Sequence, residues 1–152
     1  MSVTFNYRLK ASQQKENAFA ARLETIGYTC TTTQNQLEFT PYDVTAYNPV
    51  KNVTTTFEIK NDLKASITNR VAVEVYKYNK DSKRTPSGIT ATQSQYMVYS
   101  FNDDSFYLIP TLALWEMILN REYKKIVSGG DDNRTVMTLF DLEYFKSKCL
   151  KL

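Results

Sequence analysis

The order in which helical and strand patterns follow one another constrains the fold of this chain more than any other feature. Apolar residues recur at helical spacing from Ser12 to Ile26, and Gly27 follows them as a stop signal. Several segments with strand patterns then come before the next long helical pattern. A doubly wound parallel sheet needs strict alternation of strands and helices, which this order does not provide. We therefore expect an α/β (α+β) fold with a central mixed β-sheet flanked by helices.

The predicted strands are rich in Thr, Tyr, Phe and Val or alternate apolar and polar residues. They cover Tyr28 to Thr33, Leu37 to Tyr47, Val53 to Lys60, Arg70 to Tyr78, Tyr96 to Phe101, Phe106 to Ile109 and, as an edge strand, Thr135 to Phe140. Further helices are predicted at Ile89 to Gln95, Thr111 to Tyr123 and, with Asp141 as N-cap, Asp141 to Lys148. A chain of 152 residues has the size of one ordinary domain, so we expect a single domain over residues 1–152.

Several kinds of chemistry are excluded by what the sequence lacks. It contains no histidine and only four glycines. Without histidine there is no Ser-His-Asp or Cys-His nucleophile system and no histidine-containing zinc site. The few glycines cannot form a phosphate-binding P-loop or a GxGxxG dinucleotide-binding turn. An enzyme built from this chain would rely on carboxylates, lysines, tyrosines and a hard cation held by oxygen ligands.

Cysteine usage and hydropathy indicate the compartment. Cys30 and Cys149 are too few for a disulfide framework, as expected in a reducing environment. No apolar run approaches the roughly 18 to 20 residues that span a bilayer, and the N-terminal residues lack the apolar stretch of a signal peptide. These features predict a cytoplasmic protein, in the host cytoplasm if the chain is viral, with no membrane partner.

Positive charge is concentrated in one short stretch. The formal net charge of +3 favours an acidic partner only mildly. Four basic residues next to two tyrosines give a stronger signal; they are Lys77, Lys80, Lys83 and Arg84. The cluster indicates either a nucleic-acid-binding loop or a solvated polar loop, and the sequence does not choose between the two.

One predicted hairpin brings charged residues together. A four-residue turn over residues 49–52 sets its register, and counting outward places Asp43 opposite Glu58. Cross-strand neighbours share a face, as do residues two apart on one strand, so Lys60 joins the two carboxylates. The other face receives apolar residues suited to a core, which are Val44, Ala46, Phe57 and Ile59.

Two carboxylates and a lysine at this spacing can form a metal site for phosphodiester hydrolysis. Asp43 and Glu58 would repel each other unless a proton or a divalent cation lies between them. Mg²⁺ takes one or two carboxylates together with waters and phosphate oxygens. Lys60 beside such a cation can orient the attacking water and stabilise charge that develops on the phosphate. Taken alone, the same residues could also form a surface ion pair.

The hairpin resembles the signature of the PD-(D/E)XK nucleases. Asp43 followed by Glu58-Ile59-Lys60 on the next strand has this pattern, although Pro41 lies two residues before the aspartate rather than next to it. The order of elements over residues 13–78 is similar to the core of that family. The stretch from Glu58 to Ile89 is similar to small phage-type nucleases.

The first predicted helix adds to the resemblance. Its sequence KENAFAARLETIGY is similar to the first helix of archaeal Holliday-junction resolvases, where a glutamate that supports the metal site precedes a glycine at the same spacing as Glu16 and Gly27. The resemblance implies a restriction-endonuclease-like core and Mg²⁺- or Mn²⁺-dependent hydrolysis of duplex or branched DNA. The implied metal ligands are Asp43, Glu58 and the Ile59 carbonyl, and the implied catalytic residues also include Lys60 and the accessory acid Glu16.

Other residues are weaker candidates. Glu74 lies centrally in a valine-rich strand, where it either supports the metal ligands or faces solvent. Gln93 or Gln95 can approach the metal site from the end of the short helix, whereas Trp115 is expected in the core. The sequence leaves open a homodimer, a non-catalytic nucleic-acid-binding module on the same fold, and a viral structural protein.

Overall fold

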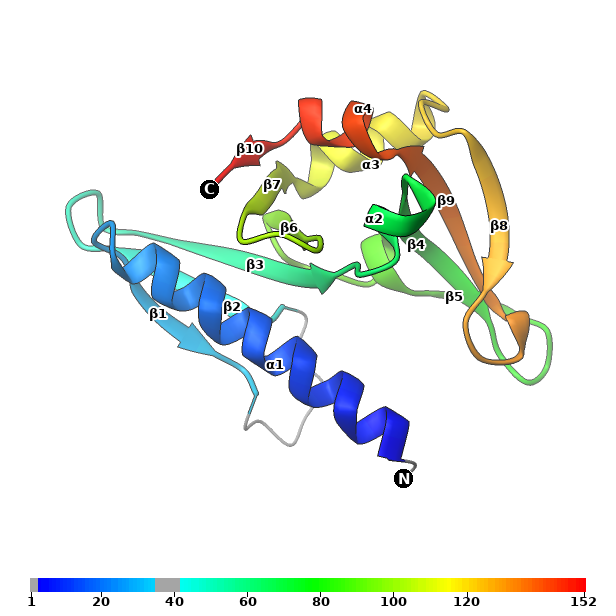
Figure 1. Ribbon diagram of the computed structural model, residues 1–152, viewed down its shortest axis with the longest axis horizontal. Helices are drawn as coiled ribbons and strands as arrows, with labels where there is room; N and C mark the ends of the chain where they lie inside the picture. Colours follow the sequence, from blue (N-terminus) through cyan, green and yellow to red (C-terminus); the bar gives the residue numbers. More distant parts are fainter. Residues whose placement is uncertain (1–2, 35–41) are drawn as a thin grey trace.

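The computed structural model describes residues 3–34 and 42–152, which form two β-sheets with helices packed around them (Figure 1). The chain starts with α1 (Val3–Glu24), β1 (Thr29–Thr32), β2 (Val44–Asn48), β3 (Val53–Asn61) and the short α2 (Ala65–Thr68). It continues with β4 (Arg70–Tyr78), β5 (Arg84–Pro86), the 3₁₀ helix η1 (Gly88–Thr90), β6 (Tyr96–Ser100), β7 (Phe106–Pro110) and α3 (Thr111–Leu119). The last elements are β8 (Lys125–Gly129), η2 (Asp131–Asn133), β9 (Thr135–Asp141), α4 (Leu142–Ser147) and β10 (Leu150–Lys151).

The strands form a large and a small sheet. Within the described residues, the large sheet has the order β1-β2-β3-β6-β7-β10 and the small sheet the order β5-β4-β9-β8. The large sheet is mixed, because β3 and β6 are parallel and its other neighbours antiparallel. With helices on both sides of it, this is the α+β architecture that the sequence predicts.

The second sheet is a difference from the sequence-based expectation, which has only one. The chain leaves the large sheet at a turn held by Asp62, directly after β3. Its carboxylate accepts hydrogen bonds from the backbone amides of Ala65 at 3.1 Å and Ala72 at 3.2 Å. These two bonds fix the turn through α2, so β4 starts a new sheet instead of pairing with β3.

The helix α1 covers one face of the large sheet. Phe19 is fully buried, and its ring lies 5.0 Å from that of Phe57 and 5.2 Å from that of Phe106, both in edge contacts. The helix ends before Gly27, whose φ of 101° is accessible to glycine at little cost. The helix starts at Val3, nine residues before the start predicted at Ser12. Its first turns were not predicted because they extend past the sheet and show no apolar periodicity; Tyr7 in these turns is 73% exposed.

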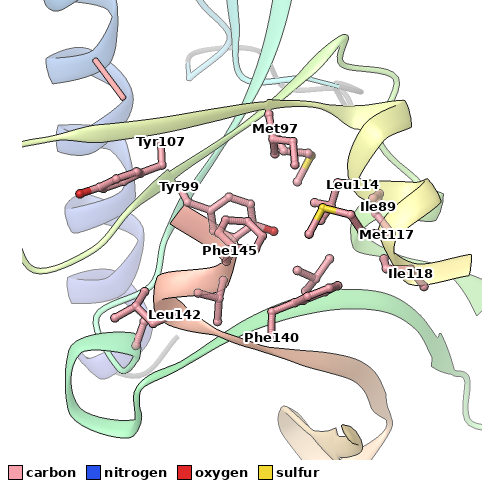
Figure 2. Close-up of a cluster of buried hydrophobic side chains, with 14 of the residues drawn as sticks. Ile89, Met97, Tyr99, Tyr107, Leu114, Met117, Ile118, Phe140, Leu142 and Phe145 are labelled. Carbon is pink, nitrogen blue, oxygen red and sulfur yellow. The ribbon is translucent and has the colours of Figure 1, made fainter. Parts of the chain in front are cut away.

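A larger core fills the space between the two sheets. Figure 2 shows side chains of β6 and β7 on one side, β4 and β9 on the other, and α3 and α4 closing the space. Rings make up much of the contact: Phe145 lies 4.8 Å from Tyr99 and 5.9 Å from Phe140. The alternating valines of β4 point into this core and are buried, as the sequence predicts for Val71, Val73 and Val75.

Several elements of the second half differ from their predictions. The predicted helix from Ile89 to Gln95 is only the single 3₁₀ turn η1, and the helix predicted to reach Tyr123 ends at Leu119. The predicted edge strand is β9, which lies between β4 and β8 in the small sheet. The strands β8 and β10 were not predicted, because their exposed residues carry little apolar alternation. Residues 37–41 of the strand predicted from Leu37 lie outside the described residues.

Candidate active site

The β2–β3 hairpin has the predicted register as far as Val44, the first residue of β2. Its pairs run from Asn48 and Val53 to Val44 and Phe57. Beyond that pair, the Asp43 amide donates to the Phe57 carbonyl at 2.9 Å, and Asp43 Oδ2 accepts from the Ile59 amide at 2.8 Å. Asp43 thus reaches along the edge of β3 with its side chain instead of continuing the ladder opposite Glu58.

Glu58 and Lys60 project from one face of β3, and the buried Phe57 and Ile59 project from the opposite face. Lys60 Nζ lies 4.0 Å from Glu58 Oε2, and the Glu58 side chain is only 16% exposed. Glu58 also shares a side-chain hydrogen bond with Asp43. The grouping of two carboxyls and one ammonium that the sequence predicts is therefore present.

Glu16 joins this group from α1. It lies one helical turn before Phe19, whose burial fixes the rotation of the helix over the sheet. The side chain of Gln34 forms a hydrogen bond with Glu16. The Gln34 amide nitrogen also donates to Gln13 O at 3.1 Å and Asn17 Oδ1 at 2.9 Å, which ties this part of the chain to the helix.

Both glutamates have raised pKa values. Burial and then the negative charge of Asp43 raise the pKa of Glu16 from 4.5 to about 7, against the Gln34 hydrogen bond and the Lys60 charge. Burial also raises the pKa of Glu58 from 4.5 to about 7; the Lys60 ammonium opposes this, and Asp43 adds to it. Three carboxyls with one ammonium leave an excess of negative charge, which a divalent cation would neutralise. We refer to Glu16, Asp43, Glu58 and Lys60 as the acidic corner.

The donor set of the acidic corner fits a hard cation. Within residues 3–34 and 42–152, no group of three or more His, Cys, Asp or Glu side chains is placed to hold a metal ion. Mg²⁺ needs fewer, because water and substrate phosphates complete its shell. Asp43 and Glu58 supply two carboxylates. The Ile59 carbonyl lies on the same edge of β3 as the Ile59 amide, which faces Asp43.

Glu74 faces the same space as Lys60. Both line a cavity of about 710 Å³ between α1, the end of β3 and the small sheet. Glu74 accepts a hydrogen bond from the Ser87 hydroxyl, so it is anchored rather than free. Gly88, with a φ of +58°, packs so closely that a Cβ there would lie 2.2 Å from the Glu74 carbonyl oxygen. The structure places Glu74 near the acidic corner, and its supporting role stays a prediction.

For the two glutamines the structure gives other contacts, and their approach to the metal site stays a prediction. Gln95 Oε1 accepts from the Thr56 amide at 3.0 Å, which joins the start of β6 to β3. Gln93 is exposed and lines another cavity, of about 610 Å³, next to Trp115. Trp115 packs against the core between the sheets, as expected from the sequence.

The predicted basic loop lies at the end of the small sheet that is farthest from β3 in Figure 1. All four of its basic residues, Lys77, Lys80, Lys83 and Arg84, are exposed. The Arg84 guanidinium stacks over the Tyr76 ring at 4.0 Å, and Asn79 Oδ1 holds the turn by accepting from the amides of Asp81 and Lys83. The structure does not bring this loop to the acidic corner.

Two residues that the sequence did not single out hold the predicted acids. Thr92 forms a side-chain hydrogen bond with Glu58, and Gln34 forms one with Glu16. Both lie in polar connections without a motif. Thr92 comes just before β6, so only the parallel pairing of β6 with β3, which the sequence does not show, could have identified it.

The fold of this chain, but not its sequence, is similar to that of a known protein. No protein-family model and no curated protein sequence matches this chain. Its mixed α+β fold, with a central mixed sheet flanked by helices, is similar to an endonuclease fold. The solved structure in question is that of I-Ssp6803I, a bacterial homing endonuclease, with a TM-score of 0.51 and 17% sequence identity. The match covers 67% of this chain and 68% of that one. At this identity, the likeness shows the fold alone.

The described residues include four α-helices, α1 to α4. None of them combines the length and the apolar character that crossing a bilayer requires.

Proposed function

We propose that this chain is a Mg²⁺- or Mn²⁺-dependent DNA endonuclease of the PD-(D/E)XK type, with one nuclease domain over residues 1–152. The observation that carries the proposal is the acidic corner, in which α1, the residue just before β2, and β3 contribute charged side chains to one place. The fold is similar to that of a homing endonuclease, which supports the same activity. DNA, duplex or branched, is the proposed substrate.

Each member of the acidic corner has a distinct role in this proposal. Asp43, Glu58 and the Ile59 carbonyl would hold the cation, which would supply positive charge at the scissile phosphate and help to activate water. The Lys60 ammonium, on its long side chain, donates to the attacking water or to a phosphate oxygen. Glu16, the accessory acid on α1, lies near Asp43 and Lys60 and can accept or return a proton. Water is the nucleophile, so no covalent intermediate with the protein forms.

Removal of one metal-binding carboxylate tests the proposal. Asp43→Asn and Glu58→Gln keep side-chain size and, at position 43, an oxygen that can accept from the Ile59 amide. Each should reduce Mg²⁺-dependent cleavage of plasmid DNA at least about 100-fold. Glu116→Gln, on the exposed side of α3, is the matched control and should cleave like the unmodified protein. Normal cleavage by both site variants would remove the acidic corner from the chemistry.

Assays of the unmodified protein distinguish an endonuclease from a non-catalytic binding module and from a structural protein. The unmodified protein should cleave at least one of linear, nicked, flapped or four-way DNA with Mg²⁺ or Mn²⁺, and a chelator should stop the reaction. Binding of DNA without cleavage of any of these substrates would instead favour a non-catalytic binding module. Neither binding nor cleavage would leave a structural protein.

A further inference from the structure

A groove runs from Lys60 of the acidic corner to three further lysines, two of which, Lys124 and Lys125, are far away in the sequence. The cavity of about 710 Å³ that contains Lys60 and Glu74 adjoins a second one of about 790 Å³. Both share Asp62, Lys64, Ala72 and Met137 in their walls, so they form one continuous depression. It runs from the end of β3, past α2, to the edge strand β8.

The far part of this groove is basic. Lys64 comes from the turn after β3, whereas Lys124 and Lys125 come from the start of β8, and all three are exposed. Within the described residues, none of these three lysines is in an ion pair. Arg70 also lines the groove, but its guanidinium lies 3.4 Å from Asp141, which offsets its charge.

Within the described residues, the two carboxylates in the groove, Asp62 and Glu74, form no ion pair with the three lysines. Both oxygens of Asp62 accept backbone amides, and Glu74 accepts the Ser87 hydroxyl. The floor is the outer face of the small sheet, where Ala72, Met137 and Leu139 are half-buried. A floor of small and apolar side chains bordered by lysines can accommodate deoxyribose, while the lysines reach its phosphates.

We propose that this groove, rather than the basic loop, holds the sugar–phosphate backbone of the DNA strand that leads to Lys60. The inference rests on the proposed function and names the surface by which the same site receives its substrate. Two features favour the groove: Lys60 lines it, and its lysines come from two separate segments, the turn after β3 and the start of β8. The basic loop lies at the far end of the small sheet, with Arg84 stacked on Tyr76.

Three triple variants that each replace three lysines by glutamine test this path with equal changes of net charge. The groove variant changes Lys64, Lys124 and Lys125; the loop variant changes Lys77, Lys80 and Lys83; the control changes Lys51, Lys148 and Lys151, which are exposed elsewhere. Binding of a fluorescent DNA duplex is measured by anisotropy at several salt concentrations in a chelator, so that cleavage does not interfere. Thermal unfolding of each variant confirms that it is folded.

The groove variant should bind at least about 100-fold more weakly at 0.1 M salt, and its slope of log affinity against log salt should fall by about 2 to 3. The loop and control variants should keep nearly the slope of the unmodified protein. A larger loss of slope in the loop variant, or equal losses in groove and loop variants, would overturn the groove as the path while the proposed function stands. Failure of the unmodified protein both to bind and to cleave DNA would overturn the proposed function itself.

Discussion

The two faces of the large sheet are covered in different ways, although the same strands form both. On one face, a single helix covers the sheet: α1 packs Phe19 and Leu23 against Phe57 and Ile59. On the other face, cover comes from α3, α4 and the small sheet, all from later parts of the chain. This second cover leaves the end of β3 open, where Lys60 lines the groove and Glu58 lies 4.0 Å from Lys60.

The difference shows how one strand can serve stability and chemistry together. Alternate residues of β3 point to opposite faces, so burying Phe57 and Ile59 under α1 necessarily directs Glu58 and Lys60 to the other side. The same helix carries Glu16 one turn from Phe19. The packing under α1 therefore positions Glu58 and Lys60 on the other face of β3 and fixes Glu16 on the helix itself.

The largest expected effect is on stability, and it tests whether both faces belong to one folding unit. Phe19→Ala in the helix-covered core and Phe140→Ala in the core between the sheets should each lower the free energy of unfolding by about 3 to 5 kcal/mol. Urea unfolding followed by circular dichroism should give a single transition for both variants. Two separate transitions in either variant would mean that the two cores unfold independently.

The next largest effect concerns Lys60, which distinguishes a catalytic ammonium from a structural one. Lys60→Ala should reduce cleavage about 100- to 1000-fold, because a donor to the developing charge is lost. In thermal-shift titrations, Mg²⁺ or Mn²⁺ should still stabilise this variant, whereas Glu58→Gln should respond weakly. Lys51→Ala is the control and should change neither quantity. Equal loss of the metal response in both site variants would show that Lys60 only holds the carboxylates in place.

A smaller effect is expected in the pH dependence of stability. The pKa of Glu58 is about 7 in the folded chain and 4.5 ordinarily, so the folded state holds its proton to higher pH. Stability is therefore lost as pH rises from 4.5 through 7. In a chelator at pH 8, Glu58→Gln should unfold with a free energy higher by about 1 to 2 kcal/mol, and the gain should vanish near pH 4. Lower stability of Glu58→Gln at pH 8 would indicate a net favourable ion pair with Lys60. Glu116→Gln should show no such pH dependence.

The smallest effect concerns α4, which helps to cover the second face. Asp141 caps this helix by accepting from the Tyr144 amide at 3.1 Å and also pairs with Arg70. Asp141→Ala should lower the free energy of unfolding by about 1 kcal/mol, as measured by urea unfolding. Asp141→Asn keeps a capping oxygen and should lower the free energy of unfolding by only a few tenths of a kcal/mol. Equal losses in both variants would assign the effect to the ion pair instead of the cap.

The parts of the molecule that could be predicted from the sequence depend on short-range geometry. The turn over residues 49–52 fixes the register up to Val44 and Phe57, and the alternation of β3 fixes which face Glu58 and Lys60 share. The cap of α4 by Asp141 is confirmed for the same reason, since it joins residues three apart. The strand β8 could not be predicted, because an exposed edge strand shows no apolar pattern.

What the sequence by itself determined is thus the local order of the acidic corner: a glutamate and a lysine on one face of a strand, an aspartate just before the preceding strand, and a helix with its own acid. Only the tertiary structure decided that Glu16 reaches them, that Thr92 and Gln34 hold the acids, and that Lys64 and Lys125 share one groove. The physical reason is distance along the chain. Backbone periodicity places neighbours within a few residues, whereas the contacts between distant segments depend on how whole helices and sheets pack.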